Sequence, residues 1–350
     1  MEGFKNFLKR KDIVFSAKRY FEDALSAMAL GLFASLLIGL ILKTIGEQTI
    51  SIGGQHGTLA PAAELLIKTG TIAMGLMGAC IGVAVAKGLN APPLVLFCSA
   101  VTGMMGAQFG GPAGALVSTA FGAEFGKAVS KETKVDIIVT PAVTLLLGML
   151  SAKLIGPAVA ALMRGLGKVI MDATTLRPFM FGIIVSVVVG LVLTAPISSA
   201  ALCIMLDLSG LAAGAAVAGC SAQMIGFAVA SFKENGIGGL FAQGLGTSML
   251  QVPNIIKNPW ILLPATLASA VNGCLSTTVF KMTNIPMGAG MGTSGLVGQI
   301  GTFTAMGFSL KVLGMILIVH IAVPAVIAIV TDRYLRGKGK IKFGDYALDL

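Results

Sequence analysis

The chain has 350 residues, of which 55% are hydrophobic and only 11% are charged, whereas soluble domains carry about 25% charged residues. Its mean hydropathy of +0.91 excludes a soluble globular protein. The low charge also excludes a disordered chain, and five cysteines are too few for a disulfide scaffold of this length. The composition is that of an all-α, polytopic integral membrane protein.

The first 20 residues form a basic arm in which phenylalanines are interleaved with lysines and arginines. This pattern predicts an amphipathic helix that lies on the membrane surface. The apolar stretch 24–42 follows and carries no charged residue. Its length matches the roughly 20 residues that cross a bilayer as a helix, so we expect the transmembrane domain to begin near residue 21.

Further apolar stretches continue to residue 330, and the sequence predicts about ten crossings plus re-entrant pieces. Several stretches are short or interrupted by glycine and proline. Because non-helical backbone at membrane depth is tolerated only where protein or water satisfies its amides, these interruptions predict re-entrant hairpins that line a cavity. The further stretches are 71–86, 92–107, 113–125, 141–163, 178–194, 208–232, 238–250, 260–280, 286–308 and 312–330.

Basic residues gather at both ends of the chain, in the arm 1–20 and in a tail, 333–350. Cytoplasmic segments near a membrane are enriched in lysine and arginine, so we expect both termini to be cytoplasmic and the number of crossings to be even. Much of the net charge of +10 lies at these ends, where anionic lipid headgroups would attract it. Binding to nucleic acid is not predicted.

A weak internal repeat links the segments 136–145 and 260–267. They share a Pro-Ala-x-(Thr)-Leu core that starts at Pro141 and Pro264, and each follows a glycine-rich polar stretch. We therefore expect the transmembrane domain, 21–332, to consist of two related halves at about 20–165 and 175–332. In many transporters the substrate site lies at the interface between such repeats.

The sequence predicts no metal site and no catalytic residue. The cysteines lie in apolar segments without CxxC spacing, which predicts buried core residues and no disulfide. The two histidines, His56 and His320, have no second metal-ligating side chain at helical spacing, and His320 is expected to be a hydrogen-bonded core histidine. Because nucleotide-binding loops and nucleophile elbows are also missing from the sequence, no cofactor is predicted, and transport or sensing remains.

Three clusters of polar residues among glycines interrupt the apolar stretches, at 106–124, 243–254 and 284–299. Polar groups are costly in hydrocarbon unless they face a cavity or one another. Taken singly, each residue also fits a packing seam of small residues between helices. As clusters they predict a cavity for a neutral polyhydroxyl or amide ligand, because amides and hydroxyls both donate and accept hydrogen bonds. The candidate substrate-binding residues are Gln108, Gln223, Gln243, Thr247, Ser248, Gln251, Asn254, Asn284, Thr293 and Ser294. The candidate hinge and close-approach residues are Gly110, Gly111, Gly246, Pro253, Gly290 and Gly292.

Four segments, 194–201, 219–227, 253–260 and the glycine-rich 288–299, carry a resemblance to a known family. In them the sequence resembles the PfoR-type membrane proteins, which are bacterial relatives of the EIIC membrane component of the phosphoenolpyruvate-dependent sugar phosphotransferase system (PTS) and include proteins described as toxin regulators. The resemblance covers almost the whole chain. It implies an EIIC-like fold of about ten transmembrane helices with two re-entrant hairpins, a homodimer, and a location in the bacterial plasma membrane.

The sequence departs from the sugar-transporting relatives within their binding motif. Those relatives carry Asn-Glu-Pro upstream of an Asn-Pro pair, and the glutamate binds sugar hydroxyls. Here the Asn-Pro pair begins at Asn258, but Thr247 and Ser248 stand near the place of the glutamate, and a hydroxyl cannot act as the base for phosphoryl transfer. Glu124 is one substitute from the first half, although the lysines that follow it equally predict a solvated cytoplasmic face.

Two functions follow. In the first, the chain is a PTS EIIC-like permease that moves a small polar solute, a sugar or related metabolite, by alternating access. It is then at most the membrane subunit of a sugar phosphotransferase, with the phosphoryl donor on separate IIA and IIB proteins. In the second, it is a non-transporting membrane sensor or regulator that signals through its basic tails. Removal of residues 338–350 is expected to spare a permease and to silence a sensor.

Overall fold

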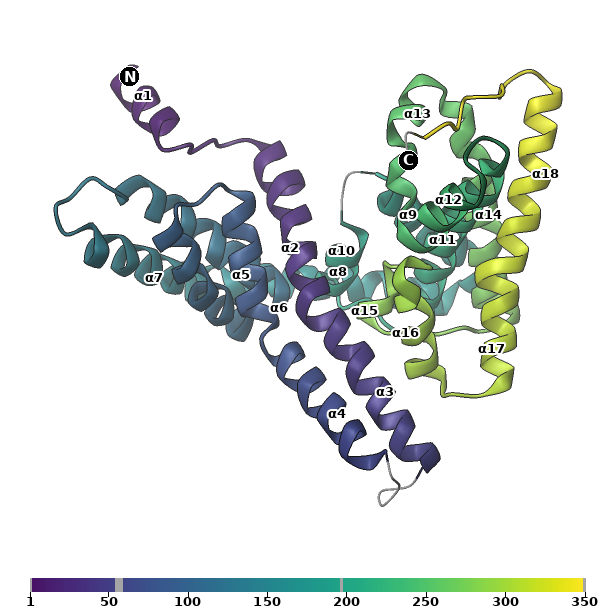
Figure 1. Cartoon of the computed structure of the whole chain (residues 1–350), viewed down its shortest axis with the longest axis horizontal. Helices are drawn as coiled ribbons and strands as arrows, with labels where there is room; N and C mark the ends of the chain where they lie inside the picture. The colour runs from purple at the N-terminus through teal and green to yellow at the C-terminus, as the bar shows by residue number, and fades with distance from the viewer. Residues whose placement is uncertain (1, 54–58, 196–197, 349–350) are drawn as a thin grey trace. The chain divides into compact units, whose positions relative to one another are not determined.

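The computed structural model describes residues 2–53, 59–195 and 198–348, and the elements formed by these residues are helices, with one isolated antiparallel bridge between Gly210 and Asn284 (Figure 1). The chain divides into two units, Met1–Arg164 and Gly165–Leu350. The prediction of an all-α, polytopic membrane protein is confirmed by this helical architecture and by the apolar spans described below.

The first unit begins with a nine-residue helix, α1, which covers half of the predicted amphipathic arm. A long helical run follows, in which two π-helical segments, η1 and η2, alternate with α2 and α3. The last helix of this unit, α8, continues into the second unit. The bounds are α1 Glu2–Arg10, η1 Lys18–Ala24, α2 Leu25–Leu32, η2 Phe33–Leu37, α3 Ile38–Gly53, α4 Ala60–Gly75, α5 Met77–Gly88, α6 Pro93–Val129, α7 Asp136–Leu154 and α8 Gly156–Leu176.

α6 is a helical hairpin. At Gly111 the backbone has φ 59° and ψ −154°, a region that is essentially restricted to glycine. The two arms on either side of this kink pack so closely that a Cβ atom on Gly106 would overlap the carbonyl oxygen of Gly114. The Ser118 hydroxyl also donates to the Thr102 carbonyl oxygen across the hairpin (2.7 Å). The predicted stretches 92–107 and 113–125 are therefore the two arms of one hairpin.

The second unit surrounds a buried helix, α11, which is rich in alanine and glycine. Small residues let neighbouring helices approach closely, and a Cβ atom on Gly219 would overlap the carbonyl oxygen of Ser186 on α9. Helices α9, α14 and α18 pack against α11. The bounds are α9 Pro178–Thr194, α10 Ser199–Met205, α11 Gly210–Ala230, α12 Phe232–Phe241, η3 Ala242–Gly246, η4 Ser248–Gln251, α13 Val252–Lys257, η5 Pro259–Leu262, α14 Leu263–Cys274, η6 Leu275–Val279, α15 Pro286–Ala289, η7 Ser294–Leu296, α16 Val297–Met306, α17 Leu310–Ile316, η8 Leu317–Ala322 and α18 Val323–Gly337.

The kink of α6 has a counterpart in the second unit. Gly236, inside α12, has φ 58° and ψ −152°, nearly the values found in α6. The chain reverses here too, because Gln243 beyond the kink donates to the hydroxyl of Ser231 before it (2.7 Å). In both units an apolar helix with a proline follows the reversal, with Pro141 in α7 and Pro264 in α14.

Six described helical runs are long and apolar enough to cross a membrane by length and composition alone, and one of them is the hairpin α6, which reverses at Gly111. The pair α4 and α5, bent by 52° at their junction, makes a seventh if it is one broken span. This criterion gives fewer spans than the predicted ten, because some predicted stretches form short helices such as α12 and others form the arms of one hairpin. The six runs are Lys18–Ser51, Pro93–Val129, Asp136–Leu154, Gly210–Ala230, Pro259–Val279 and Leu310–Gly337.

Candidate functional site

A network of neutral polar side chains joins four helical elements of the second unit. Gln223, fully buried on α11, accepts a hydrogen bond from the Thr194 hydroxyl on α9 (3.2 Å). Its amide donates to the hydroxyls of Thr266 and Ser269 on α14, each at 3.3 Å. The Thr194 hydroxyl also lies 2.8 Å from the Ser248 hydroxyl at the start of η4. We call these five side chains the Gln223 group.

The Gln223 group contains four hydroxyls and one carboxamide and has no charged member. Each of these groups can donate and accept hydrogen bonds, which is what a neutral polyhydroxyl ligand requires. Hydroxyls and amides do not take up a proton as a general base near neutral pH. The arrangement is therefore suited to binding a polar molecule and not to activating a hydroxyl for phosphoryl transfer.

Thr247, Pro253 and Gly246 shape the backbone beside this group. The Thr247 hydroxyl accepts a hydrogen bond from the Met249 amide (3.2 Å) and caps η4. Pro253 stands in the first turn of α13, where its missing amide hydrogen leaves no helical bond unmade. Gly246 is exposed at the end of η3. In the described structure Thr247 thus has a capping role.

Three buried carboxamides, Gln243, Gln251 and Asn254, form a second set, which we call the carboxamide chain. Gln251 donates to the side-chain oxygen of Gln243 (2.9 Å), and Asn254 donates to the side-chain oxygen of Gln251 (3.0 Å). Gln243 in turn donates to the Ser231 hydroxyl at the end of α11 (2.7 Å). The chain of bonds runs through η3, η4 and α13, and it fixes these short helices to one another.

The C-terminal tail, 338–348, docks on the carboxamide chain. Gln251 donates to the backbone carbonyl oxygen of Tyr346 (3.0 Å), and Asn254 donates to that of Ala347 (2.8 Å). The predicted tail 333–350 therefore has two parts. Residues 333–337 are the end of α18, and the segment 338–348 lies against the second unit. This contact satisfies two of the side chains that the sequence proposes for substrate binding.

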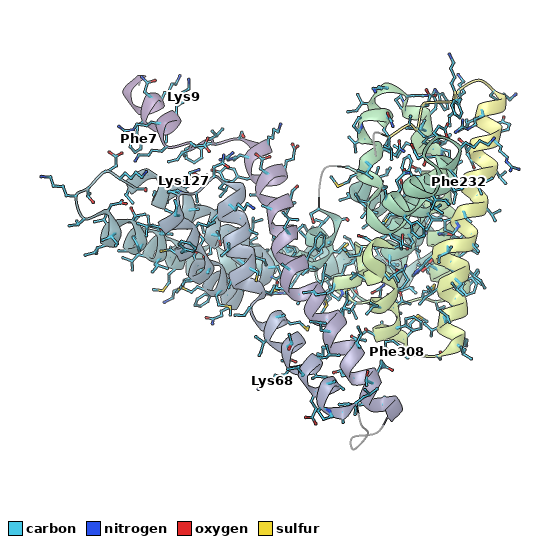
Figure 2. All side chains as sticks on the ribbon, in the orientation of Figure 1. Phe7, Lys9, Lys68, Lys127, Phe232 and Phe308 are labelled. Carbon is cyan, nitrogen blue, oxygen red and sulfur yellow. The ribbon has the colours of Figure 1, made fainter. Side chains whose placement is uncertain are left out.

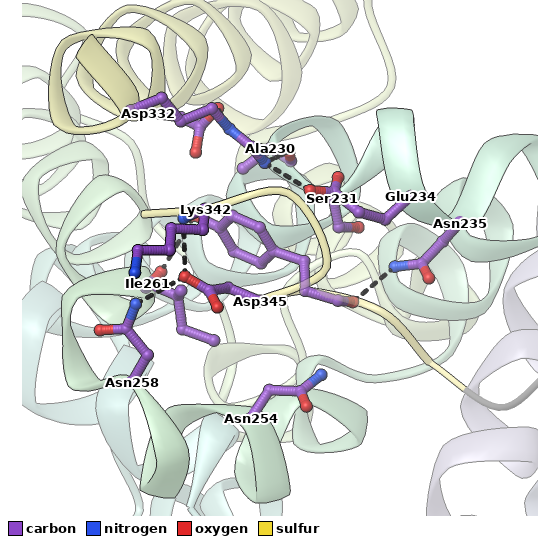
Figure 3. Close-up of polar contacts among 12 residues, drawn as sticks. Ala230, Ser231, Glu234, Asn235, Asn254, Asn258, Ile261, Asp332, Lys342 and Asp345 are labelled. Carbon is purple, nitrogen blue, oxygen red and sulfur yellow. Dashed lines mark hydrogen bonds and ion pairs between the residues drawn. The ribbon is translucent and has the colours of Figure 1, made fainter. Parts of the chain in front are cut away.

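Two further asparagines hold the tail, as Figure 3 shows. Asn235 donates to the Tyr346 carbonyl oxygen at 2.8 Å, and Asn258 donates to the Asp345 carboxylate at 2.7 Å. Asn258 also donates to the carbonyl oxygen of Lys340 (2.9 Å). The tail is held chiefly through its backbone, so its conformation matters more than the identity of most of its side chains.

The Tyr346 side chain is fully buried and fills the core at this end of the unit. Its ring packs edge-on against Phe227 (6.3 Å between centroids), and Arg336 lies 5.4 Å from its centroid. Arg336 bridges the carboxylates of Glu234 (2.8 Å) and Asp332 (2.7 Å). Burial raises the pKa of Tyr346 above its ordinary value of 10.0, and the charge of Asp332 acts in the same direction.

The third cluster folds back on the same unit. Buried Asn284 donates to the Gly298 carbonyl oxygen (2.9 Å) and to the Thr302 hydroxyl (3.0 Å), and Thr293 donates to the carbonyl oxygen of Gly244. Ser294 is half-buried at the start of η7.

Gly290 and Gly292 allow this segment to lie against its neighbours. A Cβ atom on Gly290 would overlap the carbonyl oxygen of Ser199, and Gly292, with φ 55°, approaches the backbone of Cys220. Gln108, by contrast, is exposed on α6 of the first unit, shortly before Gly110 and the Gly111 kink.

Sequence reasoning missed Thr194, Thr266 and Ser269 as partners of Gln223, and Asn235 and Tyr346 at the tail. Serine and threonine in helices often bond to their own backbone, as Thr266 does with the carbonyl oxygen of Leu262 (2.9 Å). Their positions alone therefore carried no signal of a network. Asn235 and Asn258 flank the polar cluster 243–254, and these two positions were the one indication in the sequence of the contacts with the tail.

Glu124 lies in a buried ion pair in the first unit, which corrects the expectation of a solvated face. Its carboxylate is 2.9 Å from the ammonium group of Lys127, which Figure 2 labels near the end of α6. Lys127 also donates to the backbone carbonyl oxygens of Asp12 (2.7 Å) and Leu89 (2.9 Å). The pair thus fastens the N-terminal arm to α5 and α6.

Comparison with protein families gives one match, to the family described as Phosphotransferase system, EIIC, over residues 22–348. No curated protein and no solved structure matches the chain. The matched range takes in most of the long helical run Lys18–Ser51, both kinked hairpins, the polar groups of the second unit and the docked tail.

Proposed function

Since the chain belongs to the phosphotransferase system EIIC family, we propose that it is a membrane permease that carries a small polar solute, a sugar or related metabolite, across the bacterial plasma membrane by alternating access. The observation that carries this proposal is the Gln223 group. It is a fully neutral hydrogen-bonding network that joins α9, α11, α14 and η4 inside apolar surroundings.

The proposed solute replaces hydrogen bonds that the Gln223 group makes within itself. In the described conformation Gln223 and Ser248 are buried and bonded to protein partners. A solute hydroxyl can replace each of these hydrogen bonds with one of its own. The free-energy cost of the exchange is therefore mainly the cost of separating the helices. This favours neutral hydroxyl-bearing ligands over anionic ones, because the group offers no cation to pair with a ligand charge.

The remaining parts of the proposal extend the family assignment. Phosphorylation of the solute would need a donor and a base from separate IIA and IIB proteins, because the Gln223 group has no proton acceptor of its own. We place both termini in the cytoplasm, with anionic lipids at the basic ends, and we expect a homodimer of the PfoR type. The nearly equal kinks at Gly111 and Gly236 support two related halves.

A second candidate function is a ligand sensor or regulator with the same fold. One contact favours it, the docking of the tail on Gln251 and Asn254. Ser248 and Gln251 are the two ends of η4, so a ligand that moved Ser248 would also move the residue that holds Tyr346. Binding of the solute would then release the tail, and the released tail would be the signal.

The test is a thermal-shift screen of the purified protein against sugars, sugar acids, polyols, nucleosides and amino acids, because a ligand that binds only the folded state raises the melting temperature. A hit should be weakened at least tenfold in affinity by Gln223→Leu and by Ser248→Ala, and left unchanged by Thr304→Ala, an exposed position on α16. Unchanged affinity in both site variants would reject the site.

Uptake in proteoliposomes then separates the two functions. A permease accumulates or equilibrates the hit, with or without a phosphoryl donor. A sensor binds the hit without moving it, and ligand exposes the tail to protease.

A further inference from the structure

A separate polar group lies inside the second unit, away from the tail. It consists of His320 on η8, Gln299 on α16 and Asn272 on α14, whose exposed fractions are 0%, 6% and 0%. The Gln299 amide nitrogen is 3.1 Å from His320 Nδ1, and the Asn272 amide donates to the backbone carbonyl oxygen of Val319 (2.7 Å). We call these three side chains the His320 group.

Each member of the His320 group has one buried polar atom that lacks a hydrogen-bond partner among the described residues: His320 Nε2, Gln299 Oε1 and Asn272 Oδ1. An unpartnered buried polar atom destabilises the fold, because it loses its hydrogen bonds to water and gains none from the protein. Such atoms are rare in native proteins, and each one calls for a physical explanation. Three of them fall in the His320 group, so the hydrogen-bonding capacity of these side chains is only partly used in the described conformation.

The unused atoms match the needs of a charged histidine. A neutral imidazole donates from one nitrogen and accepts at the other, whereas an imidazolium donates from both. The group holds two unused acceptors, Gln299 Oε1 and Asn272 Oδ1. Rotation of the Gln299 amide by half a turn would place its oxygen against Nδ1, and Asn272 is bonded to the residue next to His320.

We propose that the His320 group is a proton-binding site, with His320 as the proton acceptor and the carbonyl oxygens of Gln299 and Asn272 as its hydrogen-bond acceptors. The proton comes from water and adds to a ring nitrogen, and the step needs no other reactant. The site lies within a span: η8 is a π-helical segment of the run Leu310–Gly337, and π-helical turns inside α-helices occur frequently at functional sites.

The elements packed around His320 contribute few charges. α11, α14 and α16 contain no Asp, Glu, Lys, Arg or other His, and the Cys220 thiol on α11 donates to the Val189 carbonyl oxygen (3.7 Å). Lys311 on α17 is exposed. On α18, Asp332 and Arg336 pair with each other. The titratable or charged side chains of all these elements are Cys220, Cys274, Lys311, Asp332, Arg333, Tyr334 and Arg336.

A proton on His320 would thus be the main charge in an apolar region, which is costly at membrane depth. Protonation therefore favours any conformation that opens the group to water. If the chain is the proposed permease, and this step rests on that function, protonation of His320 would shift the balance between the conformations of its transport cycle.

The test uses the fact that the chain has only two histidines. His56→Gln leaves His320 as the sole histidine, and ¹⁵N-histidine NMR of that protein in lipid nanodiscs reports the protonation of each ring nitrogen. We expect a neutral ring near pH 8 and reversible conversion to imidazolium on acidification, with the protein still folded. A ring that stays neutral until the protein unfolds would overturn the proposal.

Variants test the roles of the two carboxamides without relying on transport. Asn272→Asp, which keeps the size of the side chain and adds a negative charge, should move the midpoint of proton uptake to higher pH by one unit or more, a change of at least tenfold. Gln299→Leu removes an acceptor and should lower the midpoint by about one unit. Thr304→Ala, on the exposed side of α16, should leave it unchanged. Equal midpoints in all three variants would reject the assigned acceptors.

Discussion

Gln251 donates a hydrogen bond of 3.0 Å to the backbone carbonyl oxygen of Tyr346, 95 residues later in the chain. Asn235 donates to the same oxygen at 2.8 Å. A backbone carbonyl oxygen has two lone pairs, so both bonds can form together. This contact joins η4, α12 and the tail, and it is the point at which the candidate binding region and the C-terminal segment meet.

Replacement of Tyr346 by alanine should destabilise the second unit strongly. The ring is fully buried against Phe227 and close to Ile261, and truncation of a large buried aromatic side chain costs about 3 kcal/mol or more. Thermal or denaturant unfolding in detergent measures the loss. Phe343→Ala is the matched control, because Phe343 is in the same tail and is 77% exposed. Equal stability of the two variants would show that the tail is not docked in solution.

Removal of residues 338–350 should have at least the effect of Tyr346→Ala. The sequence alone predicted that a permease tolerates this deletion. The docked tail changes that expectation, since the deletion also leaves Gln251 and Asn254 without their backbone acceptors. A point substitution in the tail is therefore the better means to separate transport from sensing.

Alkaline pH should weaken the docking of Tyr346. Burial holds the pKa of its phenol above 10.0 in the folded protein, whereas the unfolded chain ionises near its ordinary value. The unfolded state therefore loses the proton first. The stabilising contribution is complete below about pH 10 and falls as the pH rises towards the folded pKa. Comparison of unfolding free energies at about pH 9 and pH 11 should show a steeper loss for the unchanged protein than for Tyr346→Phe. Parallel losses would contradict the assignment.

The two kinks make a paired prediction. Gly111→Ala and Gly236→Ala place a Cβ atom in a backbone region that costs other residues about 1–3 kcal/mol, so each should destabilise its own unit. Gly238→Ala lies in the same helix as Gly236, has no atom within 4 Å of its Cβ position and has no positive φ. It should be neutral or slightly stabilising. A loss in Gly238→Ala as large as that in Gly236→Ala would show that strain at the kink is not the cause.

Lys127→Met should release the N-terminal arm. The change strands Glu124 as a buried charge without its partner, and breaking a buried ion pair from one side costs about 3–5 kcal/mol. It also removes the donor to the Asp12 and Leu89 carbonyl oxygens. Limited proteolysis should then cut within residues 11–18 faster than in the unchanged protein. Adding Glu124→Gln should restore part of the stability, and a double variant that is less stable than the single one would contradict this account.

Local composition predicted the helical class and the membrane location well, because both depend on the average apolarity of a stretch. It placed an interruption at residues 110–112 of α6 but could not show that the chain reverses there, since the reversal depends on one backbone conformation at Gly111. Hydropathy cannot register a single positive φ. The same limit applies at Gly236, because its sequence context does not distinguish it from the many other glycines.

The sequence predicted which kinds of residue gather in the candidate site, but it did not predict which residues they contact. The polar clusters marked Gln243, Gln251 and Asn254, and the structure places these three in contact. The tail partners of Gln251 and Asn254 are 95 and 93 residues away, and no local pattern shows such a pairing. Glu124 was ambiguous for a similar reason, because the lysine that neutralises it was visible in sequence while the burial of both was not.

The order of synthesis gives the docked tail a further consequence. Tyr346 leaves the ribosome after α18, so the core formed by Phe227, Ile261 and Tyr346 cannot close until the whole of α18 has been made. Until then Asn235, Gln251 and Asn254 lack the backbone groups that they bind in the finished protein. The core of the second unit thus closes only after Tyr346 has been made, and a nascent chain arrested before residue 346 would leave this core open to quality-control proteases.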